Sequence, residues 1–294
     1  SPIPMQAEVV ERYALCGGVP RYLELTQPYA SLMHILKNVI ITPMSPMYTE
    51  ARNLLLDEVD VPNTAWSIME AVSGGAHRIS EIATKLALPA NQLTRYIEVL
   101  RDMKILDREV PVAEKNPAKS KKGLYFMTDP FLRFWFRCFY PYESMFEFDN
   151  LEQGLKRIQP LLEQHIALCF ESLCRTYVRQ RMTSWNCIRV GRQWSRNYEI
   201  DVAGVDEDNR FTLFGECKWS NKPVGDSVLN ALRDKVESQG LPTTSAPYWL
   251  LFSKSGFTEA LKNRANKDKH LVLVDSILAQ ISHRGTENTE GIRG

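Results

Sequence analysis

Hydrophobic residues recur at the spacing of amphipathic helices from the N-terminus to about residue 103. Residues 5–60 predict short helices that are interrupted by the turn Gly17-Gly18-Val19-Pro20. Three more helices follow, from Asn63 or Thr64 to Gly74, from a cap at Ser80 to Leu86, and from Ala90 to about Met103. A helical piece as short as residues 1–60 buries little core by itself, so we expect it to belong to a larger module.

Two apolar stretches, Ile105–Val112 and Leu124–Met127, predict a pair of strands joined by a polar, lysine-rich loop. Three helices and then a hairpin is the element order of a winged helix-turn-helix. The aromatic-rich residues 130–150 are interpreted as a helix packed between domains. A base-stacking platform is the less favoured alternative, because so dense an exposed aromatic patch would promote aggregation.

From Leu151 onward, helical and strand patterns alternate. A helix is expected to end at Pro160, and a second to run on to about Arg181. The later pattern predicts strands at Ile188–Trp194, Tyr198–Val205, Phe211–Trp219, Tyr248–Phe252 and Leu271–Val274, with helices at Val228–Glu237, at Thr258–Asn266 and at the C-terminus. Such alternation favours a mixed sheet covered on both faces.

We therefore predict an α+β multidomain chain in three parts. Residues 1–60 form a helical segment, residues 61–148 form the winged helix-turn-helix with the aromatic helix, and residues 149–294 form an α/β domain with a mixed central sheet. The length of 294 residues agrees with two or three domains at about 150 residues per domain.

The overall charge is close to zero, because 36 Lys and Arg residues oppose 35 Asp and Glu residues and leave a formal net charge of +1. This balance excludes a protein that is basic over its whole surface, so any polyanion site must be local. A local basic stretch does exist between Ser172 and Tyr198, where acidic residues are absent and these arginines occur: Arg175, Arg179, Arg181, Arg189, Arg192 and Arg196. Guanidinium groups suit phosphate oxygens.

Six scattered cysteines form no C-x-x-C pair, which argues against a zinc finger or a disulfide scaffold and favours reduced thiols. No apolar run approaches the roughly 18 residues of a membrane span, and the N-terminus lacks the features of a signal peptide. We therefore expect a cytoplasmic protein without membrane contact. The chain opens at Ser1 without Met, so residue 1 need not be the natural start.

The most specific chemistry lies in the α/β domain, at Asp201, Glu216 and Lys218. Asp201 lies in an apolar strand, and Glu216-Cys217-Lys218 ends the next one. Alternate strand residues share a face, so Glu216 and Lys218 point the same way, and a hairpin can bring Asp201 beside them. Two adjacent carboxylates repel each other unless a cation such as Mg²⁺ or Mn²⁺ neutralises them. A lysine beside such an ion can orient an attacking water or stabilise negative charge.

This order of residues resembles the PD-(D/E)xK nuclease superfamily over roughly residues 159–281. A helix with Glu171 precedes the first strand, Asp201 lies on the next strand, and the Glu-x-Lys pair lies on the third. The resemblance implies a nuclease-like fold, with Asp201 and Glu216 as metal ligands, Glu171 as an auxiliary ligand and Lys218 as the residue that positions water. A catalytic metal ion, Mg²⁺ or Mn²⁺, is therefore expected at this site.

Two alternatives remain open at this site. Glu199 precedes Asp201 by two residues, so it can share the same face and take over the ligand role. The site can also belong to a catalytically inactive nuclease fold, in which Glu216 and Lys218 form a structural ion pair. Such a domain would serve as a regulatory module or as a DNA-binding or protein-binding module.

A second set of residues is expected to contact DNA phosphates. These are Arg95 on the third helix of the winged helix-turn-helix, Lys119, Lys121 and Lys122 in its loop, and Arg189, Arg192 and Arg196 in the α/β domain. The third helix also carries acidic residues, and a lysine-rich loop is most often merely solvated. A surface without DNA contact is therefore the alternative.

The turn Gly17-Gly18-Val19-Pro20 resembles the Gly-x-Pro element in the helical lid of STAND-type AAA+ ATPases. That resemblance implies nucleotide contacts by Gly18 and Pro20, with a simple helix cap as the alternative. Together with Leu124–Trp135 and Gly215–Trp219, it extends to a predicted archaeal and bacterial ATPase family with a C-terminal domain of unknown function.

The phosphate-binding motif G-x-x-x-x-G-K-[S/T] is absent from the sequence. We therefore expect no ATP hydrolysis by this chain alone, and ATP binding only together with a separate P-loop ATPase domain. The function expected from the sequence is that of the C-terminal portion of an ATPase-family protein. It would act as an Mg²⁺-dependent DNA endonuclease-like module with a DNA-binding winged helix, in an oligomeric state that the sequence leaves open.

Overall fold

The computed structural model describes residues 3–58, 62–147 and 150–275, which form two compact units. The described parts of residues 8–109 and 121–169 make up the helical unit. Residues 3–7, 110–120 and 170–275 make up the α/β unit. The domain boundaries expected at residues 60–61 and 148–149, and the expected C-terminal helix, lie outside the described residues.

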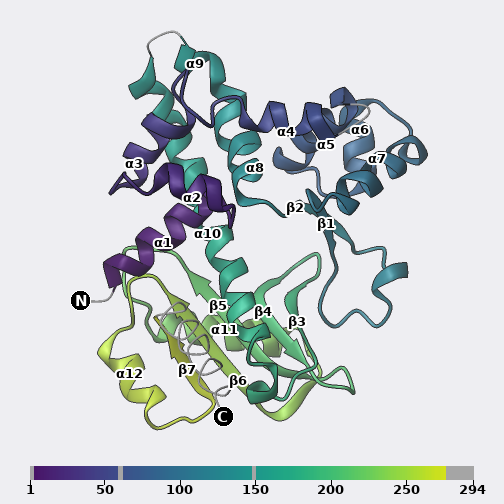
Figure 1. Cartoon of the computed structure of the whole chain (residues 1–294). Helices are drawn as coiled ribbons and strands as arrows, with labels where there is room; N and C mark the ends of the chain where they lie inside the picture. Colours follow the sequence, from purple (N-terminus) through teal and green to yellow (C-terminus); the bar gives the residue numbers. More distant parts are fainter. Residues whose placement is uncertain (1–2, 59–61, 148–149, 276–294) are drawn as a thin grey trace, which may run out of the picture. The chain divides into compact units, whose positions relative to one another are not determined.

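The helical unit combines short helices with a two-stranded antiparallel sheet (Figure 1). Its helices are the part of α1 (Ile3–Cys16) from residue 8 onward, α2 (Pro20–Thr26), α3 (Leu32–Ile35) with the π-helix η1 (Leu36–Ile40), α4 (Glu50–Glu58), α5 (Pro62–Ser73), α6 (Ile79–Leu86), α7 (Ala90–Asp102), α8 (Pro130–Phe134) with the π-helix η3 (Trp135–Phe139), the 3-10 helix η4 (Tyr140–Tyr142), α9 (Glu143–Glu147) and the first part of α10 (Leu151–Arg179). The sheet pairs β1 (Leu106–Glu109) with β2 (Leu124–Met127). The helices α5, α6 and α7 are followed by the hairpin of β1 and β2. This is the order of elements from which a winged helix was predicted.

Trp135 lies in the core of the helical unit and is fully buried. Its ring packs edge-on against Trp66 at 5.2 Å and stacks on Tyr140 at 5.1 Å. The indole N–H donates to the backbone carbonyl of Tyr48 at 3.3 Å, and the guanidinium of Arg52 lies 5.7 Å from the ring. The aromatic segment therefore forms packed core of the helical unit and is not an exposed platform.

Pro160 does not end a helix, contrary to expectation, because α10 runs without interruption from Leu151 to Arg179. A proline inside a helix removes one hydrogen bond and costs about 3 kcal/mol. Ile158, Leu162 and Ile166, on one face of α10, are 1, 4 and 3 % exposed. Burial of this face outweighs the local cost of the proline, as tertiary packing commonly does.

The start of α6 also differs from the expected one. The helix begins at Ile79, so Ser80 lies inside it and is not its cap. Glu81 supplies the capping interaction instead, since its Oε2 accepts the backbone N–H groups of His77 and Arg78, each at 2.9 Å. A carboxylate in the first turn can satisfy free N–H groups in this way.

The α/β unit is built on a five-stranded mixed sheet with the order β3-β4-β5-β6-β7. Its strands are β3 (Arg189–Trp194), β4 (Glu199–Val205), β5 (Phe211–Lys218), β6 (Thr243–Ser253) and β7 (Leu271–Val274). The first three strands form an antiparallel meander, and β6 and β7 are added in parallel. The 3-10 helix η5 (Met182–Trp185) precedes β3, α11 (Asp226–Ser238) follows β5, and α12 (Glu259–Ala265) follows β6.

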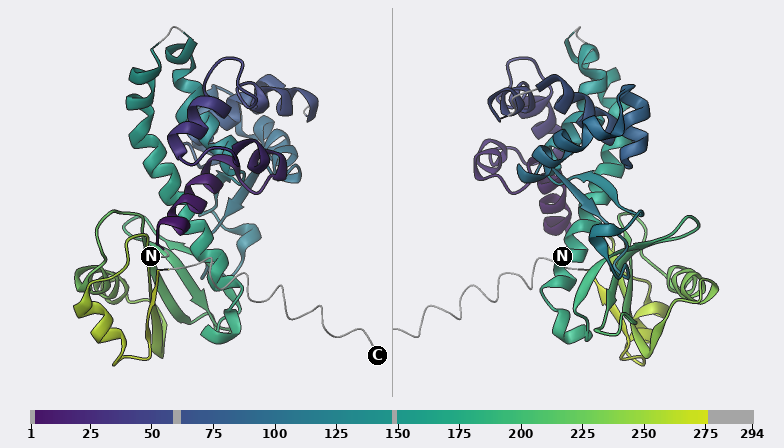
Figure 2. Two further views of the ribbon diagram at one scale, coloured as in Figure 1. Left: turned by 60° about the vertical axis from the view of Figure 1, so that its left-hand side comes forward. Right: turned by 90° about the vertical axis from the view of Figure 1, so that its right-hand side faces the viewer.

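Helices cover both faces of this sheet (Figure 2). On one face, Tyr177 of α10 packs edge-on against Phe252 of β6, with the ring centroids 5.9 Å apart. On the other face, Leu232 of α11 and Leu261 of α12 pack into one buried cluster with Phe214 and other strand residues. The mixed sheet with helices on both faces confirms the predicted α+β fold class.

The loop between β1 and β2 contributes residues 110–120 to the α/β unit. The backbone N–H of Val112 donates to the carbonyl of Arg192 on β3 at 2.9 Å, and the side chain of Val112 joins the buried cluster of the sheet. The side chain of Asn209 donates to the carbonyl of Ala113 at 2.9 Å. The strand expected up to Val112 therefore ends at Glu109, because the following residues pair with β3 instead.

Candidate active site

The ladder between β4 and β5 stops where the predicted catalytic residues begin. Its last pair is Val202 opposite Gly215, so Asp201 and Glu216 are the next residues on the two strands. There Asp201 Oδ2 accepts the backbone N–H of Cys217 at 2.8 Å. A side-chain carboxylate thus takes the place of a ladder hydrogen bond, and we call this point the fork.

Helix α10 supplies the fourth predicted residue, Glu171, together with Arg175. Nη1 of Arg175 lies 3.7 Å from Glu171 Oε2 and donates to the backbone carbonyl of Asp201 at 3.2 Å. Arg175 is only 7 % exposed. A single buried guanidinium therefore links α10 to the strand that carries Asp201, and one helical turn separates it from Glu171.

Glu171, Asp201 and Glu216 form what we call the carboxylate cluster. Burial, followed by the charges of Glu171 and Glu216, raises the pKa of Asp201 to about 7. Burial also raises the pKa of Glu171, although the charge of Arg175 opposes the shift. Both shifts favour the protonated, uncharged form of these carboxyl groups, and such perturbed pKa values are typical of functional sites.

Glu216 lies between two lysines. Its Oε1 is 2.8 Å from Lys218 Nζ, and its Oε2 is 3.2 Å from Lys235 Nζ. Burial alone would lower the pKa of Lys218, but the hydrogen bond and the charge of Glu216 outweigh burial and the pKa is raised. Lys218 therefore stays protonated at neutral pH and acts as a cation, not as a general base.

A pocket of about 260 Å³ opens beside the fork, lined by Glu216, Lys218, Ser227, Val228, Ala231, Leu232 and Lys235. Lys235 was not predicted from the sequence. It lies on α11, whose apolar face packs on the sheet, and a charged residue on the other face of such a helix is usually just solvated. Only the fold, which places α11 against the face of β5 that carries Glu216, brings this lysine to the site.

Oxygen atoms at the fork that could bind a metal ion already have partners in the protein. Within residues 3–58, 62–147 and 150–275, no three His, Cys, Asp or Glu side chains are grouped so that they could hold a metal ion. The oxygens of Glu216 contact two lysines, and Asp201 accepts a backbone N–H. Mg²⁺ commonly takes one or two carboxylates and keeps several waters. The arrangement therefore fits an ion that keeps most of its water ligands better than an ion bound only by protein side chains.

The predicted DNA-contacting arginines of the α/β unit have different surroundings. Nη2 of Arg189 donates to Asn209 Oδ1 at 2.6 Å, which helps to fix the docked loop. Arg192 pairs with Glu199, the alternative metal ligand. Arg196 is exposed. Two of the three arginines therefore have partners within the protein, and Arg196 has the exposed position that a phosphate contact requires.

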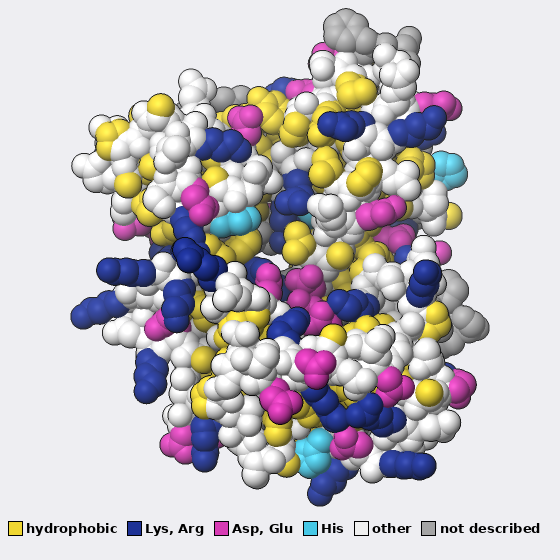
Figure 3. All heavy atoms as spheres, turned by 180° about the vertical axis from the view of Figure 1, so that it is seen from behind, with side chains coloured by type: hydrophobic (Ala, Val, Ile, Leu, Met, Phe, Trp, Pro, Cys, Tyr) yellow, Lys and Arg dark blue, Asp and Glu magenta, His cyan; other side chains and the backbone are white. Residues whose placement is uncertain are grey.

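The predicted phosphate contacts around the hairpin are divided between the units. Arg95, Lys121 and Lys122 are exposed in the helical unit, and Lys119 is exposed in the loop that belongs to the α/β unit. In the space-filling view of Figure 3, acidic and basic side chains are intermixed over most of the face shown, in keeping with the near-zero net charge.

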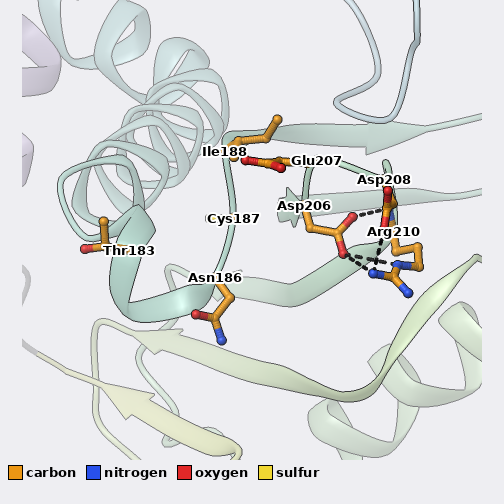
Figure 4. Close-up of a pocket in the computed structure, with 8 residues that line it drawn as sticks. All are labelled: Thr183, Asn186, Cys187, Ile188, Asp206, Glu207, Asp208 and Arg210. Atoms are coloured by element: carbon orange, nitrogen blue, oxygen red, sulfur yellow. Dashed lines mark hydrogen bonds and ion pairs between the residues drawn. The ribbon is translucent and has the colours of Figure 1, made fainter.

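A larger surface hollow of about 500 Å³ lies at the other ends of β4 and β5, between η5 and the turn that joins the two strands (Figure 4). Arg210 pairs there with Asp206 at 3.2 Å and with Asp208 at 2.8 Å. The turn thus supplies a cation for its own carboxylates. We assign no chemistry to this hollow.

The Gly17–Pro20 turn joins α1 to α2. Gly17 has a φ of +59°, and a Cβ at this position would lie 3.2 Å from Asp129 Oδ2 and 3.3 Å from Pro130 Cδ. Gly18 is exposed with no atom within 4 Å of such a Cβ, and Pro20 is the first residue of α2. The positive φ and the close neighbours therefore favour glycine at position 17, whereas a Cβ at position 18 would meet open space.

This contrast gives a matched pair of substitutions. Gly17→Ala is expected to lower the free energy of unfolding by about 1–2 kcal/mol, because alanine is strained at positive φ and crowds Asp129. Gly18→Ala should change it by less than about 0.5 kcal/mol. Urea unfolding of both variants checks the difference, and equal losses would contradict the assignment of the cap to Gly17.

All six cysteines are free and buried. In the part of the chain that the structure describes, no helix is both long enough and apolar enough to cross a membrane.

The candidate site lies within a segment that matches a protein family. Residues 135–234 match a family described as "Archaea bacterial proteins of unknown function" (DUF234). These residues include the carboxylate cluster and Lys218, and they end one residue before Lys235. An uncharacterized protein of Methanocaldococcus jannaschii is 28 % identical over 221 residues, which are 73 % of this chain and 48 % of the relative. The chain thus spans about half the length of this relative.

Two solved structures show a distant likeness. Can2 from Sulfobacillus thermosulfidooxidans, in complex with cyclic tetra-adenylate, is 12 % identical with a TM-score of 0.29, over 80 % of this chain and 54 % of that one. Protein VC1899 from Vibrio cholerae is 17 % identical with a TM-score of 0.30, over 97 % of this chain and 57 % of that one. At such TM-scores the likeness supports no inference about function.

Proposed function

We propose that the α/β unit hydrolyses phosphodiester bonds in DNA with the help of a divalent cation. The observation that carries the proposal is the carboxylate cluster at the fork, where burial and two neighbouring carboxylates raise the pKa of Asp201 to about 7. So much buried negative charge is costly to a fold that gains nothing from it. A cation bound by Asp201 and Glu216, with Glu171 as an auxiliary ligand, would relieve that cost.

A bound Mg²⁺ or Mn²⁺ would polarise the phosphate and lower the pKa of a coordinated water. The chain's own residues have separate tasks. Asp201 and Glu216, on two strands whose ladder ends beside them, would hold the ion. Arg175 holds Glu171 and the backbone of Asp201 in place. Lys218, protonated and 40 % exposed at the pocket, orients the attacking water and stabilises the negative charge that develops on the phosphate.

The test is cleavage of duplex, branched and single-stranded DNA with Mg²⁺ or Mn²⁺, and with EDTA as the blank. Lys218→Met is expected to slow cleavage at least about 100-fold, because it removes charge stabilisation at the reacting phosphate. Lys262→Met is the matched control, since Lys262 forms a surface ion pair with Glu259 on α12. Equal rates for the wild type and Lys218→Met would refute the proposed role.

A second candidate function is favoured by the two lysines on Glu216. If Lys218 and Lys235 serve only to neutralise this carboxylate, the unit is an inactive nuclease fold that binds DNA or protein. This function predicts that neither metal supports cleavage. It also predicts that Lys218→Met lowers stability, because the substitution leaves a half-buried carboxylate with one cation fewer.

The proposal also names residues that contact DNA and ATP. Arg95, Lys119, Lys121, Lys122, Arg189, Arg192 and Arg196 are proposed as phosphate contacts, with α5–α7 and the β1–β2 hairpin as a DNA-binding winged helix. Gly18 and Pro20 are proposed to contact ATP bound by a P-loop ATPase domain. Six free thiols suit the cytoplasm, which we propose as the location.

A further inference from the structure

Two lysines from separate elements converge on one carboxylate beside the fork. Lys218 comes from β5 and Lys235 from α11, and each contacts a different oxygen of Glu216. Lys235 Nζ also donates to the backbone carbonyl of Glu199 at 2.8 Å. An ammonium group has three N–H bonds, so these two contacts fix its position and leave one N–H for a ligand.

Lys235 also lies where a ligand can reach it. Its side chain is 30 % exposed and lines the pocket of about 260 Å³ together with Lys218. Val228, Ala231 and Leu232 add apolar lining to the pocket. Among the residues that line the pocket, the two lysines oppose one carboxylate, that of Glu216. The pocket therefore favours an anionic group beside the proposed reaction centre.

We propose that Lys235 is a phosphate-binding residue of this site, whose ammonium group binds a non-bridging oxygen of the DNA backbone in the pocket beside the fork. The inference rests on the proposed function, which supplies the phosphodiester as the anion. Lys235 thereby places the DNA strand, and Lys218 acts on the reacting phosphate. Glu216 and the carbonyl of Glu199 hold the ammonium group in position before DNA binds.

The test is DNA binding, measured by fluorescence anisotropy in Ca²⁺ and in EDTA over a series of salt concentrations. Lys235→Met is expected to raise the Kd about tenfold and to reduce the slope of log Kd against log salt concentration by about one, as the loss of one phosphate contact does. Lys235→Arg should keep both values close to those of the wild type, because it retains the charge. Lys262→Met, the surface control, should leave both unchanged.

A merely structural lysine would give another result. Lys235→Met would then lower the melting temperature while its Kd and salt slope match those of the wild type, and this outcome overturns the proposal. So does a wild type that does not bind DNA. Cleavage of the same DNA is measured in parallel. If DNA binding depends on Lys235 but no DNA is cleaved, the phosphate site is supported and the nuclease activity is refuted. If DNA is cleaved but its binding does not depend on Lys235, the nuclease activity is supported and the phosphate site is refuted.

Discussion

Asp201→Asn is expected to raise the free energy of unfolding at about pH 8 by about 2–3 kcal/mol. Burial and the charges of Glu171 and Glu216 raise the pKa of Asp201 to about 7 in the folded protein, from an ordinary value of 3.8. The ionised carboxylate therefore destabilises the fold. Asparagine has the same shape and removes the charge, and its amide oxygen can still accept the N–H of Cys217.

The size of this stabilisation depends on pH. Between about pH 4 and pH 7 the folded chain keeps a proton on Asp201 that the unfolded chain has lost, so the stability of the wild type falls as pH rises through this window. Above about pH 7 both states are ionised and the loss is complete. The gain in Asp201→Asn should therefore be small near pH 4 and largest above pH 7.

Urea unfolding at both ends of this pH range measures the gain. Asp208→Asn is the matched control, because Asp208 is 73 % exposed and its removal should change stability by no more than about 0.5 kcal/mol. A wild type that is more stable than Asp201→Asn at about pH 8 would mean that the carboxylate is satisfied by its protein neighbours. The site would then be a structural ion-pair network.

Trp135→Ala is expected to lower the free energy of unfolding by about 3–5 kcal/mol, the range for truncating a large buried aromatic residue. Trp135 is fully buried, packs against Trp66 and Tyr140, and donates its indole N–H to Tyr48. The substitution would leave both a cavity and an unpaired carbonyl. Arg52 would also lose its contact with the indole ring.

Urea unfolding, followed by the far-UV circular dichroism signal of the helices, measures this loss of unfolding free energy. Trp135→Phe is the matched variant, because it keeps an aromatic ring and removes the N–H; its loss should be about half as large. A loss below about 1 kcal/mol for Trp135→Ala would contradict the assignment of Trp135 to the core of the helical unit.

Much of the α/β unit could be predicted because its strands are short apolar runs between clear turns. The predicted strand at residues 271–274 is β7 without change, and β3, β4 and β5 differ from prediction by one residue at an end. The turn between β4 and β5 fixed their antiparallel pairing, and that pairing alone makes Asp201 and Glu216 neighbours at the end of the ladder. Local pattern and local topology were sufficient for these features.

The features that were not predicted depend on contacts between distant segments. Val112 looked like part of a hairpin strand, but its partner is Arg192 on β3. Pro160 carries a strong local signal for a helix end, which the burial of Ile158 and Leu162 on α10 outweighs. Lys235 has no local signal, because its relation to Glu216 exists only after α11 has packed on the sheet.

In the proposed function, the carboxylate cluster serves phosphodiester hydrolysis and not the stability of the fold. The most direct test is the rate of Mn²⁺-dependent DNA cleavage by Asp201→Asn and by the wild type at about pH 8, on samples whose unfolding has been measured. We expect the variant to be the more stable protein and to cleave at least about 100-fold more slowly. Equal rates, or a wild type that cleaves no DNA with Mn²⁺, would contradict the proposed function.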